Sequence, residues 1–111
     1  MDILNYINGS QTPSSSSQWI ENFNPATREM LGKVTSSNPQ DIDQAVQAAK
    51  KAFQGWSSLS IDERAEYILK LSQKISDNFE ELALLETKDT GKPISTSQAI
   101  DIPRSVLNLK F

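Results

Sequence analysis

The chain has neither cysteine nor histidine among its 111 residues. Without cysteine, a disulfide, a thiolate nucleophile and a thiolate metal site are all excluded. Without histidine, the chain lacks the side chain that most often serves as a general base near neutral pH. These 111 residues are therefore poorly equipped for catalysis by themselves, and we assign no catalytic residue to them.

Basic residues and long apolar runs are also scarce. Eleven Lys and Arg stand against fourteen Asp and Glu, and no basic cluster could neutralise several phosphates in a row. No apolar run approaches the roughly 18–20 residues that cross a bilayer, and residues 1–18 lack the basic start and apolar centre of a signal peptide. We therefore expect no nucleic-acid partner, no membrane partner and a cytoplasmic location.

The first third of the sequence predicts short strands. Leu4, Tyr6 and Ile7 precede Asn8-Gly9, a pair that tolerates the positive φ angles of a tight hairpin turn. Two further apolar runs, at 19–23 and 30–35, are separated by a proline-containing turn. The serines at 14–17 are expected to form a flexible connection. Because two or three short strands are not stable alone, another layer must cover them.

Helical spacing replaces the strands after this β arm of residues 1–36. In the second region, residues 37–111, Asn38 is expected to cap the first helix, and Asp41 places a negative charge in its first turn. The helix is expected to end near Gly55. Its inner face is mostly alanine, which allows close approach of a neighbouring layer but buries little apolar area. This pattern indicates a helix that packs on a larger body.

Two further helices are predicted from their boundary residues. Ser60 and Glu63 form a capping box, in which each side chain accepts a hydrogen bond from the other residue's backbone amide. A second box, Asp77 with Glu80, is expected to start a third helix, and Gly91 is expected to end it in the left-handed conformation. The inner faces include either Leu71 or Ser72 in the first of these helices, and either Leu85 or Glu86 in the second.

A fourth helix is predicted at the end of the chain. Asp101 is expected to cap it and Pro103 to lie in its first turn, with Ile102, Val106 and Leu109 at helical spacing. The pattern is still helical at Phe111, so we expect the sequence to be truncated there.

Several motifs follow an order that resembles the N-terminal portion of the NAD(P)-dependent aldehyde dehydrogenase superfamily. The motifs are FNPATRE followed by LGKV, then NPQDIDQAVQAAKKAFQGW, SIDERAEYILKLSQKI and ELALLETKDTGKP. Their order and spacing carry the resemblance, which runs from about Asn5 to Phe111. The last stretch, DIPRSVLNLKF, is similar to the 2-aminomuconate and 2-hydroxymuconate semialdehyde dehydrogenases, whose aldehydes also bear a carboxylate.

The resemblance implies an α/β fold with a NAD-binding domain, a catalytic domain and an oligomerising β-hairpin, on a much longer chain. It implies oxidation of an aldehyde to the acid with NAD or NADP, through a cysteine nucleophile and a glutamate base that lie outside these residues. The present segment would be α+β, with residues 37–111 as the first helices of the NAD-binding domain. Without the Rossmann-like sheet it would be incomplete, inactive and unable to bind the cofactor, whereas the full-length enzyme would be a homo-oligomer.

The resemblance also implies two kinds of site. It places Arg104 at the mouth of the substrate tunnel, where a guanidinium offers a fork of donors that matches a carboxylate. The alternative is an arginine in solvent or one paired with Asp101. Asp89, with Asn22 and the backbone near Phe23, resembles a structural site for a monovalent cation, because carboxylate and carbonyl oxygens suit hard cations. The alternative there is a helix-end carboxylate in solvent.

A second function from another class is compatible with the same residues. The chain could be a non-enzymatic interaction module that binds a full-length relative, since the absence of cysteine and histidine suits such a role equally well.

Overall fold

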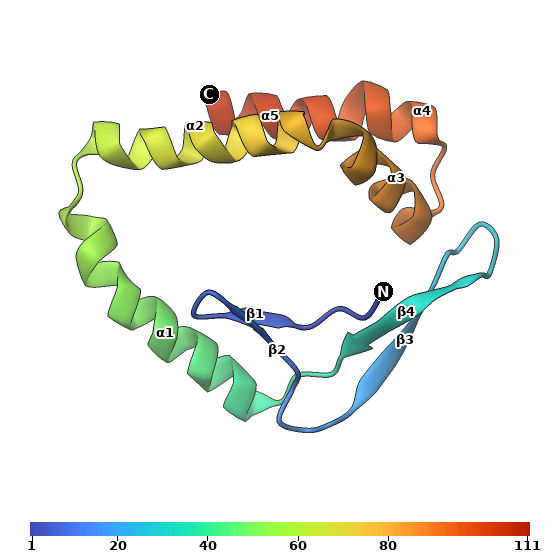
Figure 1. The fold of residues 1–111 in the computed structure, drawn as a ribbon, viewed down its shortest axis with the longest axis horizontal. Coiled ribbons are helices and arrows are strands. Elements are labelled where there is room, and N and C mark those ends of the chain that lie inside the picture. Colours follow the sequence, from blue (N-terminus) through green and yellow to red (C-terminus); the bar gives the residue numbers. More distant parts are fainter. The chain divides into compact units, whose positions relative to one another are not determined.

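The computed structural model describes residues 1–111, which form two compact units (Figure 1). One unit contains Met1–Phe23 and Met30–Ser58, and the other contains Asn24–Glu29 and Leu59–Phe111. No helix is both long and apolar enough to cross a membrane. The expected division into a β arm at 1–36 and helices at 37–111 stays a prediction.

Two antiparallel hairpins begin the first unit. Strand β1 (Asn5–Ile7) pairs with β2 (Ser10–Thr12), and β3 (Trp19–Phe23) pairs with β4 (Met30–Thr35). The turn between β1 and β2 is Asn8-Gly9, with φ angles of 53° and 78°, as its residue types predict. The predicted hairpin and the two later strands are confirmed.

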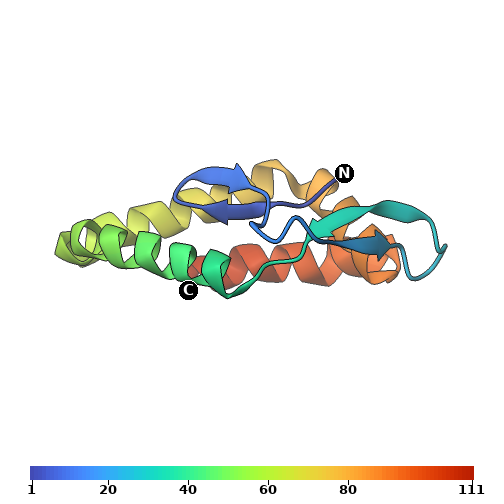
Figure 2. The ribbon, with the colours of Figure 1, turned by 90° about the horizontal axis from the view of Figure 1, so that it is seen from below.

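Helix α1 (Pro39–Ser58) completes the first unit and begins at the predicted cap. The Asn38 amide donates to Asp41 Oδ2 at 2.9 Å, and the Asp41 amide donates to Asn38 Oδ1 at 3.1 Å. Strand β1 packs against α1 (Figure 2). The helix continues past Gly55, so its predicted end was wrong, because a glycine weakens a helix but does not stop it unless its backbone turns left-handed.

The serine stretch is held by hydrogen bonds, so the expectation of a flexible connection was wrong. Ser14 is buried, its amide donates to Thr35 Oγ1 at 2.7 Å, and its hydroxyl donates to Asp41 Oδ2 at 2.5 Å. The Ser15 amide donates to Asp41 Oδ1 at 3.0 Å. These serines supply the donors that a buried carboxylate requires. The hydrogen bond from Ser14, followed by those from the Asn38 and Ser15 amides, holds the pKa of Asp41 well below its usual range.

The lowered pKa of Asp41 predicts how the stability of the fold depends on pH. A carboxyl group whose pKa is lower in the folded state stabilises that state above its unfolded pKa of about 3.9, and this contribution is lost progressively as the pH falls below that value. We expect the thermal unfolding midpoint of a full-length protein carrying this segment to fall more steeply between pH 5 and pH 3 than that of its Asp41→Asn variant, which should be less stable at pH 7. Parallel pH profiles would show that Asp41 contributes nothing to acid sensitivity. Asp43→Asn, on the same helix, is the matched control.

The second unit is helical. Its elements are α2 (Ile61–Asp77), α3 (Phe79–Thr90), the single turn α4 (Ile94–Thr96), the π-helical turn η1 (Ser97–Asp101) and α5 (Ile102–Lys110). Helices α2 and α5 lie side by side and run in opposite directions (Figure 1). Ser72 of α2 is completely buried, and its hydroxyl donates to the Val106 carbonyl oxygen at 3.1 Å. A small side chain lets the two helices approach closely, so Ser72 rather than the half-exposed Leu71 is the inner residue.

The two predicted capping boxes have different outcomes. The Ser60–Glu63 box is present, with the Ser60 amide donating to Glu63 Oε2 at 2.8 Å and the Glu63 amide donating to Ser60 Oγ at 3.2 Å. The Asp77–Glu80 box is wrong, because Asp77 is the last residue of α2 and Asn78 alone separates that helix from α3. Asp77 instead accepts a hydrogen bond from its own helix.

The final helix does not begin at Asp101, so that predicted cap was also wrong. Helical backbone starts at Ile94 and continues through η1 into α5, and the Ile102 amide donates to the Ser97 carbonyl, five residues earlier. Pro103 follows at the point where the helix is widened. Proline in an ordinary helix removes a hydrogen bond and clashes with the carbonyl four residues back, whereas a π turn relieves this conflict.

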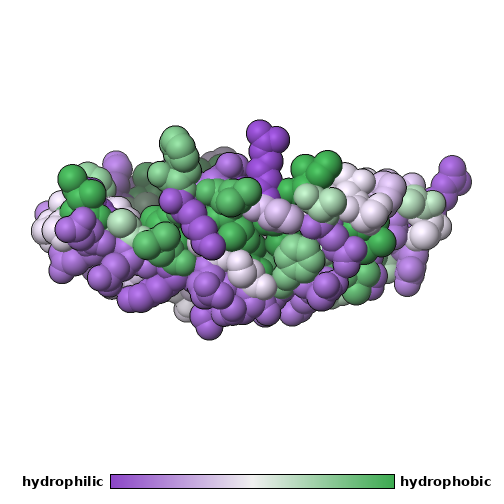
Figure 3. Space-filling view, turned by 90° about the horizontal axis from the view of Figure 1, so that it is seen from above, coloured by the Kyte–Doolittle hydropathy of each residue, from purple (hydrophilic) through white to green (hydrophobic).

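Few apolar side chains are buried. The buried hydrophobic residues are Ala83 and Ile102, whereas Phe53 and Tyr67 are 63% and 56% exposed. Figure 3 shows apolar side chains between hydrophilic ones across one face of the molecule. Such exposure leaves little hydrophobic stabilisation for the segment by itself.

We expect the isolated 111-residue chain to aggregate or to unfold without strong cooperativity. The reason is the small apolar core and the many large apolar side chains that contact water. Differential scanning calorimetry, with light scattering to report aggregation, is the measurement. A sharp two-state transition in a monomer would contradict this expectation.

Candidate functional site

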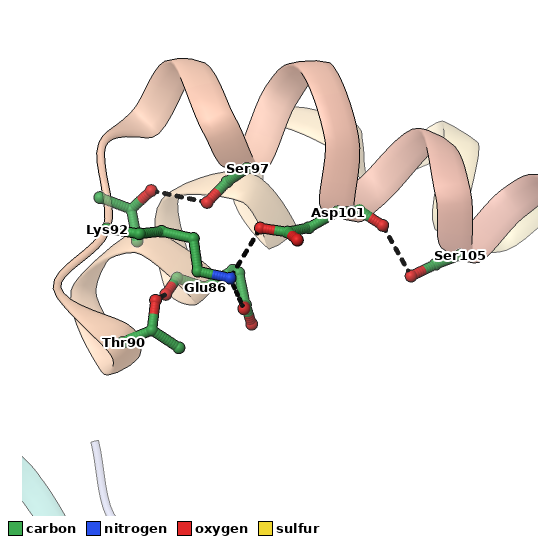
Figure 4. A network of polar contacts seen from close by, with 7 residues as sticks. Glu86, Thr90, Lys92, Ser97, Asp101 and Ser105 are labelled. Carbon is green, nitrogen blue, oxygen red and sulfur yellow. Dashed lines mark hydrogen bonds and ion pairs between the residues drawn. The ribbon is translucent and has the colours of Figure 1, made fainter.

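A cluster of charged side chains joins three parts of the second unit (Figure 4). Lys92 lies in the connection after α3, Glu86 lies in α3, and Asp101 is the last residue of η1. The Lys92 ammonium contacts Glu86 Oε1 at 2.7 Å and Asp101 Oδ2 at 2.8 Å. Glu86 is therefore the residue of its predicted pair that takes part in packing, and Leu85 is the more exposed one.

Local structure explains how Lys92 reaches both carboxylates. Gly91 ends α3 with a φ of 73°, as predicted, and turns the chain so that Lys92 leaves the helix. Ser97 is completely buried, and its hydroxyl lies 2.9 Å from Thr87 Oγ1, which fixes η1 against α3. The partners of Lys92, with Asp101 contributing most and Glu86 next, raise the pKa of its ammonium, so the side chain stays charged.

Arg104 lies beside this cluster, at a depression of about 310 Å³. The depression is lined by side chains from α3, η1 and α5: Glu86, Asp101, Ile102, Arg104, Ser105 and Asn108. Arg104 is exposed, and its guanidinium makes no hydrogen bond or ion pair within the chain. The alternative in which Arg104 pairs with Asp101 does not occur, because Asp101 is held by Lys92.

The residues of the expected cation site belong to different units. Asn22 and Phe23 end β3 in the first unit, whereas Asp89 lies in the last turn of α3 in the second. A site for a monovalent cation at these residues stays a prediction. No group of three or more Asp and Glu side chains is arranged to hold a metal ion.

Arg104 stays a predicted substrate-binding residue, and no sequence pattern points to the contacts of Lys92 with two carboxylates. Glu86 and Asp101 lie six residues before and nine residues after this lysine, and neither separation is the three or four residues that bring side chains together on one helix. Only the left-handed turn at Gly91 and the widened turn at η1 bring the three charges together. No pattern in the sequence could have shown this cluster.

Comparison with known proteins identifies the family. The model of the aldehyde dehydrogenase family matches residues 11–111, and the chain belongs to this family. It is 41% identical over 107 residues to 2-aminomuconic semialdehyde dehydrogenase of Mus musculus, covering 96% of this chain and 22% of that protein. It is 38% identical over 110 residues to 2-hydroxymuconic semialdehyde dehydrogenase of Pseudomonas sp. strain CF600, covering 98% of this chain and 23% of that protein.

Solved structures of longer aldehyde dehydrogenases contain a segment with the same fold as this chain. PnpE of Pseudomonas sp. WBC-3 matches with a TM-score of 0.96 and 34% identity over 99% of this chain and 23% of that one. The NAD+ complex of an aldehyde dehydrogenase from Bacillus cereus matches with a TM-score of 0.93 and 38% identity, over 99% of this chain and 23% of that one. The expected α+β segment of an aldehyde dehydrogenase is therefore confirmed, and the chain spans less than a quarter of the length of these relatives.

The inability of this segment to bind NAD or NADP by itself stays a prediction. Dinucleotide sites of the Rossmann type use parallel strands with a helix that begins at the phosphates. Both hairpins here are antiparallel, and the last of their strands leads into a helix capped by its own Asn38 and Asp41 side chains. We assign no residue of this chain to NAD.

Proposed function

We propose that this chain is the N-terminal segment of an NAD(P)-dependent aldehyde dehydrogenase that oxidises a carboxylated semialdehyde of the muconic type to the diacid. One observation carries the choice of substrate: an exposed and unpaired guanidinium, Arg104, at a depression whose carboxylates are already bound by Lys92. The semialdehyde dehydrogenases of mouse and Pseudomonas, which are similar to this chain, support the same choice.

In this proposal the segment binds and orients the substrate but does not react with it. Arg104 would hold the carboxylate that lies far from the aldehyde, through two parallel hydrogen bonds from its guanidinium. The catalytic cysteine, the general base and the contacts to NAD or NADP would come from the remainder of the enzyme. We propose a homo-oligomer in the cytoplasm as its working form.

Substrate preference tests this function. The enzyme would be a full-length dehydrogenase carrying this segment, either native or with these 111 residues replacing the aligned residues of the Pseudomonas relative. NADH or NADPH formation is measured with 6-oxohexanoate and with hexanal, which have equal chain length and differ by one carboxylate. We expect kcat/KM to be higher for 6-oxohexanoate. Equal values for both aldehydes would contradict the proposal.

The interaction module is the alternative, and intact mass distinguishes it. The protein can be detected in its natural source through a peptide such as AFQGWSSLSIDER and then weighed undigested. A mass several times larger than 12.4 kDa supports the dehydrogenase. A mass of 12.4 kDa, together with stoichiometric co-purification of a full-length relative, would favour the module.

A further inference from the structure

Asp101 and Arg104 are spaced so that they could form an ion pair on one helix. Residues three apart on continuous helical backbone are neighbours on one helix face, and opposite charges at this spacing attract each other. The backbone from Asp101 to Arg104 is continuously helical, and both side chains line the same depression. If nothing else held Asp101, its carboxylate could pair with the guanidinium from three residues away on the same helix.

Lys92 binds Asp101 instead. Its ammonium contacts Asp101 and Glu86 at 2.8 Å and 2.7 Å, and the three side chains are only 29–37% exposed. The ion pair between Lys70 and Glu66, by comparison, is 3.8 Å long with side chains 72% and 69% exposed. Because solvent screens the partly buried cluster less, its preference for the observed arrangement is stronger.

The π turn contributes an independent part of this arrangement. Its extra residue rotates Asp101 relative to the helix before it, and buried Ser97, in contact with Thr87, fixes the start of the turn. Figure 4 shows Asp101 pointing toward Lys92 between the two helical segments.

We propose that Lys92 is a positioning residue that keeps Asp101 away from Arg104, so that the guanidinium stays open for the substrate carboxylate. This inference rests on the proposed function. Loss of the lysine releases a carboxylate three residues from Arg104, and the substrate must then displace an internal competitor. The effect falls on KM for substrates that carry a carboxylate and leaves the turnover of uncharged aldehydes unchanged.

The test compares four variants of the full-length dehydrogenase that carries this segment. Lys92→Met is expected to raise KM for 6-oxohexanoate roughly three- to tenfold, with kcat and the values for hexanal near those of the parent. Adding Asp101→Asn to Lys92→Met should return KM to the parent value. Adding Glu86→Gln restores the same net charge but leaves Asp101 free, so KM should stay high. Lys70→Met, which removes a lysine outside the depression, should change neither substrate.

The KM values of these variants show whether Lys92 keeps Asp101 away from Arg104. Equal restoration by Asp101→Asn and by Glu86→Gln would overturn the proposal, because local charge alone would then explain the effect. An unchanged KM in Lys92→Met would overturn it as well. If that variant does not fold, Lys92→Gln, which removes the positive charge that holds Asp101 but stays polar, is expected to show the same selective rise, and a parent-like KM would count against the proposal. Arg104→Ala in the same assay separates the two claims: a selective effect there, without one at Lys92, leaves the proposed function standing.

Discussion

Replacing Arg104 with alanine in the full-length dehydrogenase is expected to raise KM for 6-oxohexanoate about tenfold to hundredfold and to leave KM for hexanal within about twofold. A hydrogen bond to a charged group contributes roughly 1.5–3 kcal/mol, and each 1.4 kcal/mol is a factor of ten in affinity. The guanidinium has no partner within the chain, so its removal leaves no buried charge unpaired. The measurement is steady-state kinetics with both aldehydes.

Two further variants sharpen this result. Arg104→Lys keeps the charge but loses the planar fork of donors, so we expect a smaller selective rise in KM than alanine gives. Arg64→Ala removes an arginine from α2 that does not line the depression, and it should affect neither aldehyde. Equal loss of activity toward both substrates in Arg104→Ala would mean that the arginine supports the structure and does not select the substrate.

Gly91→Ala is expected to destabilise the second unit by about 2 kcal/mol or more. The backbone at Gly91 has a φ of 73°, which costs a residue with a Cβ roughly 1–2 kcal/mol. An added Cβ would also lie 2.9 Å from Pro25 Cγ and 3.1 Å from the Ala26 backbone nitrogen, within the same unit. The backbone atom cannot move aside as easily as a flexible side chain, so the chain must shift around α3's end.

The thermal unfolding midpoint of the full-length dehydrogenase is the measurement, and Gly55→Ala is the matched control. Gly55 lies inside α1, where an added Cβ would meet no atom within 4 Å. The same substitution there should stabilise the helix by about 0.5–1 kcal/mol, because alanine is the better helix former. An unchanged or raised midpoint in Gly91→Ala would mean that the left-handed turn at Gly91 does not control stability.

Some elements were predicted correctly from the sequence because they depend on residues that are neighbours in the chain. The Asn8-Gly9 turn, the Ser60–Glu63 box and the glycine stop at Gly91 each depend on residues that are close in the chain. The two wrong caps failed because they depend on tertiary context. Asp77 is the last residue of α2 and so cannot cap α3. Asp101 lies inside a continuous helical segment, where its carboxylate pairs with Lys92.

The serine stretch shows the same limit at longer range. Serine hydroxyls can accept from amides two residues on, as Ser14 and Ser16 do here, but the hydrogen bonds that Ser14 and Ser15 donate to Asp41 are long-range contacts. Asp41 lies 27 residues from Ser14 in the chain, so no window of the sequence contains both ends of this hydrogen bond.

The sequence by itself determined the family, the α+β character and Arg104 as the residue to examine. Motif order and short-range periodicity are properties of neighbouring residues, and they are present before the chain folds. Only the tertiary structure decided which charges meet: that Lys92 binds Glu86 and Asp101, and that Arg104 is left without a partner. Ion pairs depend on distances in space, and the turns at Gly91 and η1 set those distances through backbone geometry that charge patterning alone does not encode.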